Sequence, residues 1–197
     1  EVINGASAVQ GLGATGGSIN YITKTPKADG TRFGVNVRAA SQFRSDSLDW
    51  KTGYSVSHKS DAFDLLGYAS VQRRGMGYDG NGRRLGIDSV QGDTLDSHGD
   101  DLFLKIGRNF GDQRIQLSVN RFNMAGDGDY KNEPGIVAQG VTTTSVEGRP
   151  PGDPARNKVR SASLDYRHAA LAGGALTVQL FKHDFESLYG ATNTVTF

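Results

Sequence analysis

The chain lacks cysteine, has only 5 prolines among 197 residues, and contains no long apolar run. The absence of cysteine excludes a disulfide framework and thiolate-bound metal sites. No segment approaches the roughly 18 consecutive apolar residues that a spanning helix needs, which argues against a helical membrane protein. A barrel remains compatible with this composition, because its strands need only one apolar face.

Neither sign of charge predominates, since the chain contains 22 Lys and Arg and 21 Asp and Glu, which gives a net charge of +1. This balance gives no electrostatic case for a nucleic-acid partner. Arrangements typical of enzymes are absent as well. The four histidines form no H-x-x-x-H pair, and no G-x-S-x-G motif occurs. The sequence therefore predicts a protein that is not an enzyme.

Alternation of apolar and polar residues with a period of 2 dominates the chain. In 101–110, for example, Leu102, Leu104 and Ile106 oppose Lys105 and Asn109. This pattern predicts β-strands. Strands of about 10 residues are long for a globular domain but match the 9–11 residues that a tilted strand needs to cross a bilayer. The seven predicted strands are 32–42, 49–58, 62–72, 101–110, 114–123, 158–168 and 175–186.

The connections between these strands alternate in length. Those at 59–61, 111–113 and 169–174 are short, whereas 73–100 and 124–157 are long. Outer-membrane barrels combine short periplasmic turns with long extracellular loops, and long loops are uncommon in compact domains. We therefore predict an all-β fold that is part of a transmembrane antiparallel β-barrel. Because seven is odd and bacterial single-chain barrels are even, the strands are not expected to close on themselves.

Two motifs resemble ligand sites but lack the required context. Gly11–Gly16 matches G-x-G-x-x-G, yet no helix follows it to receive a dinucleotide. The pairs Asp79/Asn81 and Asp127/Asp129 resemble calcium loops, but neither cluster completes the ligand pattern of an EF-hand. Asx-Gly turns explain both clusters better. We expect no cofactor-binding, metal-binding or catalytic residues.

The long connections mix cations with aromatic residues. Arg73, Arg74, Tyr78 and Tyr130 are the candidate ligand-binding residues there. Guanidinium and phenol groups suit an anionic, oxygen-rich ligand. The alternative is that these residues are ordinary solvated residues of exposed loops. Both interpretations remain open for each single residue.

The first 26 residues form a segment rich in small residues that differs from the rest of the chain. Its distinctive positions are Gly5, Ser7, Gly11, Gly16, Gly17, Ile19, Asn20, Thr23, Lys24 and Pro26. With these residues, the segment resembles the end of the plug domain in TonB-dependent outer-membrane receptors, and its second half matches well. Three positions depart from the family pattern: Asn4 replaces the usual arginine, Ala6 a proline and Gln10 an aromatic residue.

Less specific motifs at 77–82, 91–94, 126–130 and 164–166 look similar to those of the ferric-aerobactin class of siderophore receptor. The resemblance implies a 22-stranded barrel in the bacterial outer membrane, of which this chain holds a piece. It divides the chain into the plug end (1–26), a linker (27–31) and the first strands of the barrel (32–197). It also implies energy-coupled uptake, with TonB acting on a box outside this chain.

The partners implied are a ferric siderophore, TonB and outer-membrane lipid, with iron carried by the siderophore and no cofactor bound by the protein. Three alternatives remain open at this stage. The chain could belong to a passive porin-like or adhesive barrel, to a receptor for haem, vitamin B12 or a glycan, or to a soluble β-sandwich.

Overall fold

The computed structural model describes residues 2–4, 17–19, 23–87 and 95–189, and it confirms an all-β fold. Seven long strands form one sheet in the order β11-β10-β7-β6-β5-β4-β3, and each strand is antiparallel to its neighbours. They are β3 (Gly30–Ala40), β4 (Asp49–Lys59), β5 (Asp64–Arg74), β6 (Ser97–Phe110), β7 (Gln113–Gly126), β10 (Arg156–Leu171) and β11 (Gly174–Leu188).

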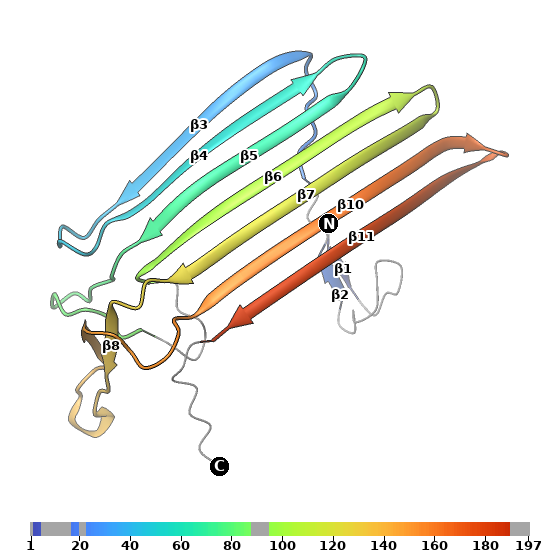
Figure 1. Ribbon diagram of the computed structural model, residues 1–197. Helices are drawn as coiled ribbons and strands as arrows, with labels where there is room; N and C mark the ends of the chain where they lie inside the picture. The colour runs from blue at the N-terminus through green and yellow to red at the C-terminus, as the bar shows by residue number, and fades with distance from the viewer. Residues whose placement is uncertain (1, 5–16, 20–22, 88–94, 190–197) are drawn as a thin grey trace.

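The sheet is an open meander, with short turns gathered at one end and long connections at the other (Figure 1). This arrangement is the alternation predicted from the sequence. Within the described residues β3 and β11 are the free edges, and the sheet does not close. Two small sheets accompany it, formed by β1 (Val2–Asn4) with β2 (Gly17–Ile19) and by β8 (Tyr130–Glu133) with β9 (Thr144–Glu147).

The later strands are longer than the sequence pattern indicated. β6 begins at Ser97 rather than at 101, and β7 continues to Gly126 rather than ending at 123. These extensions pair in register, Ser97 with Gly126 and His98 with Ala125. They carry few apolar side chains on either face, so alternation could not reveal them. The extra length lies at the end of the sheet that bears the long connections (Figure 1).

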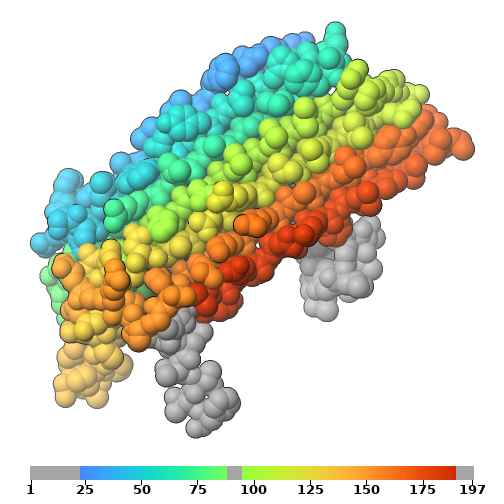
Figure 2. Space-filling model, in the orientation of Figure 1, coloured from blue at the N-terminus to red at the C-terminus, as the bar shows by residue number. Residues whose placement is uncertain are grey.

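Pair register separates the side chains into two faces. The apolar face carries Phe33, Tyr54, Leu104, Leu117 and Val178, among others. Nothing among the described residues covers it: Phe33 is 82% and Leu180 is 64% exposed, and Met76 is the only buried apolar residue described. Figure 2 shows the strands side by side as one continuous surface. In water such a surface would be an aggregation liability, so this face needs an apolar environment.

The opposite, polar face is held together by hydrogen bonds rather than by apolar packing. Near the short turns, Arg114 donates a bidentate pair of hydrogen bonds to Asp64, with Nη1 2.7 Å and Nη2 2.9 Å from the two carboxylate oxygens. Gly107 lies between them in the sheet, and a Cβ there would come 2.1 Å from Arg114 Nη2. The absence of a side chain at Gly107 is therefore what lets Arg114 cross β6 to reach β5.

Within the part of the chain that the structure describes, the one helical segment is η1 (Val137–Gln139), a single 3-10 turn. Among the described residues, no helix has the length and apolar character required to cross a membrane.

Candidate ligand-binding site

Three cations from consecutive strands gather on the polar face near the long connections. Arg38 of β3 pairs in register with Lys51 of β4, Lys51 pairs with Gln72 of β5, and Arg74 is the next residue of β5 on that face. They line a hollow of about 270 Å³, which Asp49, Trp50 and Arg73 complete. We call Arg38, Lys51 and Arg74 the basic cluster. Its cations outnumber the single carboxylate of Asp49, which already accepts the backbone N–H of Gly75 at 2.7 Å.

The predicted neighbours Arg73 and Arg74 fall on opposite faces of β5, because side chains alternate along a strand. Arg73 lies opposite His98 and Trp50 on the apolar face and forms an ion pair with Asp127, Nη2 to Oδ2 3.6 Å. Arg74 instead joins the basic cluster. Both arginines line the same hollow, but they approach it from opposite faces of β5.

Tyr78 and Tyr130 lie in a network that ties three connections together. Both phenol groups donate to the carboxylate of Asp46, from Tyr78 at 2.5 Å and from Tyr130 at 2.9 Å. Arg84 donates to the same carboxylate at 2.7 Å and stacks over the Tyr130 ring at 5.0 Å. Arg84 also reaches Glu147 of β9 at 3.1 Å. We call Asp46, Tyr78, Arg84 and Tyr130 the loop network.

The electrostatics of the loop network follow from this crowding. Burial alone would raise the pKa of Asp46, but hydrogen bonds from Tyr78, Arg84 and Tyr130 and the charge of Arg84 bring it below its usual range. Burial and the hydrogen bond to Asp46 raise the pKa of Tyr130 to about 12, and the same causes raise the pKa of Tyr78. Asp46 is thus an anion at neutral pH, and both phenols are neutral donors.

The two tyrosines remain predictions as ligand-binding residues, but their hydroxyl groups already have an acceptor in Asp46. The arrangement gives them a positioning role that the sequence did not suggest. They hold the connections β3–β4, β5–β6 and β7–β10 at fixed places above the basic cluster's end of the sheet (Figure 1).

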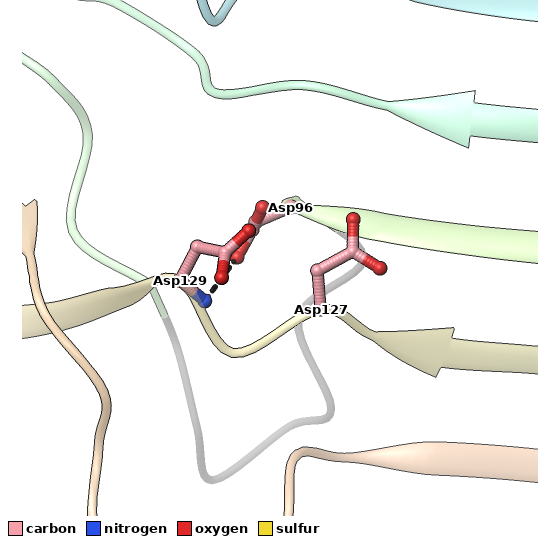
Figure 3. A group of neighbouring side chains, drawn as sticks. All are labelled: Asp96, Asp127 and Asp129. Atoms are coloured by element: carbon pink, nitrogen blue, oxygen red, sulfur yellow. Dashed lines mark hydrogen bonds between the residues drawn. The ribbon is translucent and has the colours of Figure 1, made fainter.

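A second acidic group involves Asp127 and Asp129 of the motif noted in the sequence. Together with Asp96 they bring carboxylate oxygens within 4.8 Å of one another (Figure 3). Asp96 accepts the backbone N–H of Asp129 at 2.9 Å, and Asp127 lies 2.5 Å from His98 Nδ1. Burial, together with the charges of Asp127 and Asp129, raises the pKa of Asp96. These contacts join the residue before β6 to the turn that follows β7.

The plug-motif residues are only partly described. Gly5, Ser7, Gly11, Gly16 and Asn20 lie outside the described residues, while Gly17 and Ile19 belong to β2. Thr23, Lys24 and Pro26 precede β3. This stretch is fastened to the polar face by Lys105 of β6, whose ammonium lies 2.8 Å from Thr25 Oγ1, 3.2 Å from Thr23 Oγ1 and 3.3 Å from the carbonyl oxygens of Thr23 and Lys24.

Replacing Lys105 with Met should release this stretch while preserving the length of the side chain. Lys105 is only 4% exposed, so the variant leaves several acceptors without their donor. We expect amide hydrogen exchange at 23–25 to accelerate in the whole receptor, with little change in the neighbouring strands. Lys182→Met, at an exposed position of β11 on the apolar face, is the control. Equal protection of 23–25 in both variants would contradict the role of Lys105.

The comparisons with known proteins fit this geometry. The chain is 34% identical over 134 residues to the rhizobactin receptor of Rhizobium meliloti (strain 1021), covering 66% of this chain and 18% of that protein. It is 29% identical over 198 and 202 residues to the ferric aerobactin receptors of Klebsiella pneumoniae and Escherichia coli, in each case covering 95% of this chain and 26% of the receptor.

No protein-family profile matches the chain, and no solved structure matches it. The chain spans about a quarter or less of the length of these curated relatives. The relatives are receptors rather than enzymes. The family resemblance predicted from the sequence is confirmed: this chain is a homologue of siderophore receptors and is consistent with a piece of one.

Proposed function

We propose that the chain is part of an outer-membrane receptor that takes up a ferric siderophore with energy supplied through TonB. The ligand class is proposed from the relatives, which are receptors for rhizobactin and ferric aerobactin. The distribution of apolar side chains over the sheet supports the membrane location. The domain division follows the sequence prediction, with the plug end in 1–26, a linker in 27–31 and barrel strands after it.

The apolar face is apolar only along a diagonal band. One row of paired residues runs from Val35 in β3 through Leu102 in β6 to Arg121 in β7 and Asp184 in β11, so it changes from apolar to charged. The row six residues closer to the short turns does the reverse. Over the last four strands it is charged at Arg108 in β6 and apolar at Ile115, Tyr166 and Val178.

The slope of the band gives the tilt of the strands. Six residues correspond to about 20 Å along a strand, and six strand spacings to about 29 Å across the sheet. Their ratio corresponds to an angle of about 35° between the strands and the normal to the band, which lies in the range of transmembrane barrels. A sheet packed against a second sheet in water has no reason to bear a straight apolar band at such an angle.

The height of the band agrees with a bilayer. In β6 the aliphatic residues of this face lie between Asp100 and Arg108, and in β7 between Gln113 and Arg121. Eight residues span about 27 Å along a strand, or about 22 Å along the normal of the band at the inferred tilt. The apolar belt of outer-membrane barrels is about 25 Å tall. The long connections then lie outside the cell and the short turns in the periplasm.

In this orientation the basic cluster lies in the lumen, close to the extracellular loops. An anionic siderophore complex entering from outside would meet Arg38, Lys51 and Arg74 first, and guanidinium groups match carboxylate oxygens in pairs. Iron stays bound by the siderophore. We propose the basic cluster, with Arg74 as its sequence-predicted member, as part of the ligand-binding site.

Neutralising the basic cluster tests this site. Arg74→Ala and Arg38→Ala in the whole receptor should each weaken binding of the ferric siderophore by at least about tenfold, because each removes one charge-assisted contact of about 1.5–3 kcal/mol. Arg108→Ala is the control, since it removes the same group from the apolar face of β6 near the short turns, outside the hollow. Fluorescence titration measures the affinities. A loss with Arg108→Ala as large as that with Arg74→Ala would contradict this assignment.

A measurement of siderophore uptake can exclude the alternative that the chain belongs to a passive porin-like barrel. Cells that produce the whole receptor under iron limitation should take up radioactive ferric siderophore only when TonB is present. Uptake that continues at the same rate without TonB would reject the energy-coupled mechanism. The attachment of 23–25 to the lumenal side of β6 supports a plug, because it holds this stretch at the inner face of the barrel.

A further inference from the structure

Two arginines lie directly opposite each other on the apolar face, at the border of the apolar band. Arg121 of β7 pairs in register with Arg160 of β10, and both strands are interior to the sheet. The next residues of the same face toward the short turns are Val119 in β7 and Ala162 in β10. Both guanidinium groups therefore start where the apolar band ends, on the side of the long connections.

This pairing is unfavourable within the protein itself, because like charges directly opposite each other in a sheet repel. Arg121 is 57% exposed and its nearest carboxylate, Asp100, lies 3.6 Å away. Arg160 is exposed and forms no hydrogen bond or ion pair with the part of the chain that the structure describes. The residue opposite it on the other side, Asp184, pairs with Lys182 at 3.2 Å.

The surroundings do not neutralise the pair. On this face of β6, β7, β10 and β11 beyond the band, the cations outnumber the carboxylates by five to three, which leaves a net charge of +2. The cations are Arg121, Arg156, Lys158, Arg160 and Lys182, and the carboxylates are Asp100, Asp184 and Glu186. Glu186 is already shared by Arg156 at 2.9 Å and Lys158 at 3.7 Å.

We propose that Arg121 and Arg160 bind a phosphate group in the headgroup of an outer-leaflet lipid. The proposal rests on the membrane orientation given above. At that depth the acyl chains cover Leu117 and Val119, and the headgroup lies level with the two guanidinium groups. A phosphate between them removes their repulsion and accepts paired N–H donors from each. The partner is thus a phosphorylated lipid rather than a neutral one.

The test uses the whole receptor in a neutral detergent, with bis-phosphorylated lipid A as the probe. Native mass spectrometry should show lipid A retained by the unmodified receptor, and the double variant R121Q/R160Q should bind it at least about tenfold more weakly. Arg108→Gln is the control, because Arg108 borders the same band at its periplasmic side and stacks on Phe110 at 4.8 Å. This control should bind lipid A as the unmodified receptor does.

Dephosphorylated lipid A and inorganic phosphate separate the sources of binding. The first should bind no better to the unmodified receptor than to the double variant, and the second should not displace lipid A at millimolar concentration. Unchanged lipid A affinity in R121Q/R160Q, or displacement by inorganic phosphate alone, would overturn the proposal. Siderophore affinity is measured on the same samples. If the unmodified receptor did not bind the ferric siderophore, the proposed function would be rejected, whereas the lipid result would be unaffected.

Discussion

Leu117→Arg in β7 is expected to destabilise the folded receptor in lipid by about 2–4 kcal/mol, the cost of an arginine at the middle of a transmembrane barrel. Leu117 lies at the centre of the apolar band, between Ile115 and Val119 on the same face. A guanidinium group there must leave water for hydrocarbon, and no carboxylate of the described residues faces it on the neighbouring strands, where Ile106 and Leu164 are its partners.

Asn123→Arg provides the matched control for this prediction. Asn123 is on the same strand and the same face, six residues nearer the long connections, with Asp100 and Lys158 as its paired neighbours. Because this position lies beyond the band, the substitution should cost about 0–1 kcal/mol. Urea unfolding of the receptor in lipid vesicles, followed by tryptophan fluorescence, measures both. Equal destabilisation by the two variants would place the membrane elsewhere on the sheet.

The strands and their order could be predicted because one physical rule governs them. A strand with one apolar face alternates in sequence, and Leu102, Leu104 and Ile106 make the pattern plain in β6. Where both faces are polar the rule fails, so the sequence missed the extension of β6 to Ser97 and of β10 to Arg156. The short pair β8 and β9 also escaped, because strands of 4 residues carry too little pattern.

The candidate site was harder to predict, because its members come together through register and loop geometry. Arg38 and Lys51 are 13 positions apart in sequence yet paired in the sheet. Once the strands were assigned, alternation could have placed them with Arg74 and separated Arg73 from it. Asp46 had no such signal. A single aspartate in a connection gives no indication that Tyr78 and Tyr130 both donate to it.

Asp46→Asn should uncouple the three connections that the loop network joins. The Asp46 side chain is 14% exposed and serves Tyr78, Arg84 and Tyr130 at once. An amide keeps one acceptor but removes the charge, so Arg84 loses its closest counter-ion and is left with the exposed Glu147. We expect the connections to be less stable by about 2–3 kcal/mol, below the full cost of a buried broken pair because Arg84 is partly exposed.

Hydrogen exchange of amides in 76–87 and 130–147 measures this loss, which should appear in both connections together. Asp79→Asn is the control, because the hydrogen bonds of the Asp79 carboxylate to described residues stay within its own turn: it accepts from the backbone N–H groups of Asn81 and Arg83 and from the Arg83 side chain. It should loosen 79–83 and leave 130–147 unchanged. If Asp46→Asn affected a single connection, the network would not join the loops.

Acid should reproduce the effect of Asp46→Asn without a mutation. The folded-state pKa of Asp46 lies below that of the unfolded chain, so its contribution is complete above the usual carboxyl pKa of 3.8. The contribution is then lost as the pH falls through the lowered folded-state pKa. Exchange at 130–147, corrected for its intrinsic pH dependence, should rise below about pH 4 in the unmodified receptor. In the Asp46→Asn variant the protection should already be low and should not change over this range. Since these connections lie over the basic cluster, we expect siderophore affinity to decline in parallel, which would tie the loop network to ligand capture.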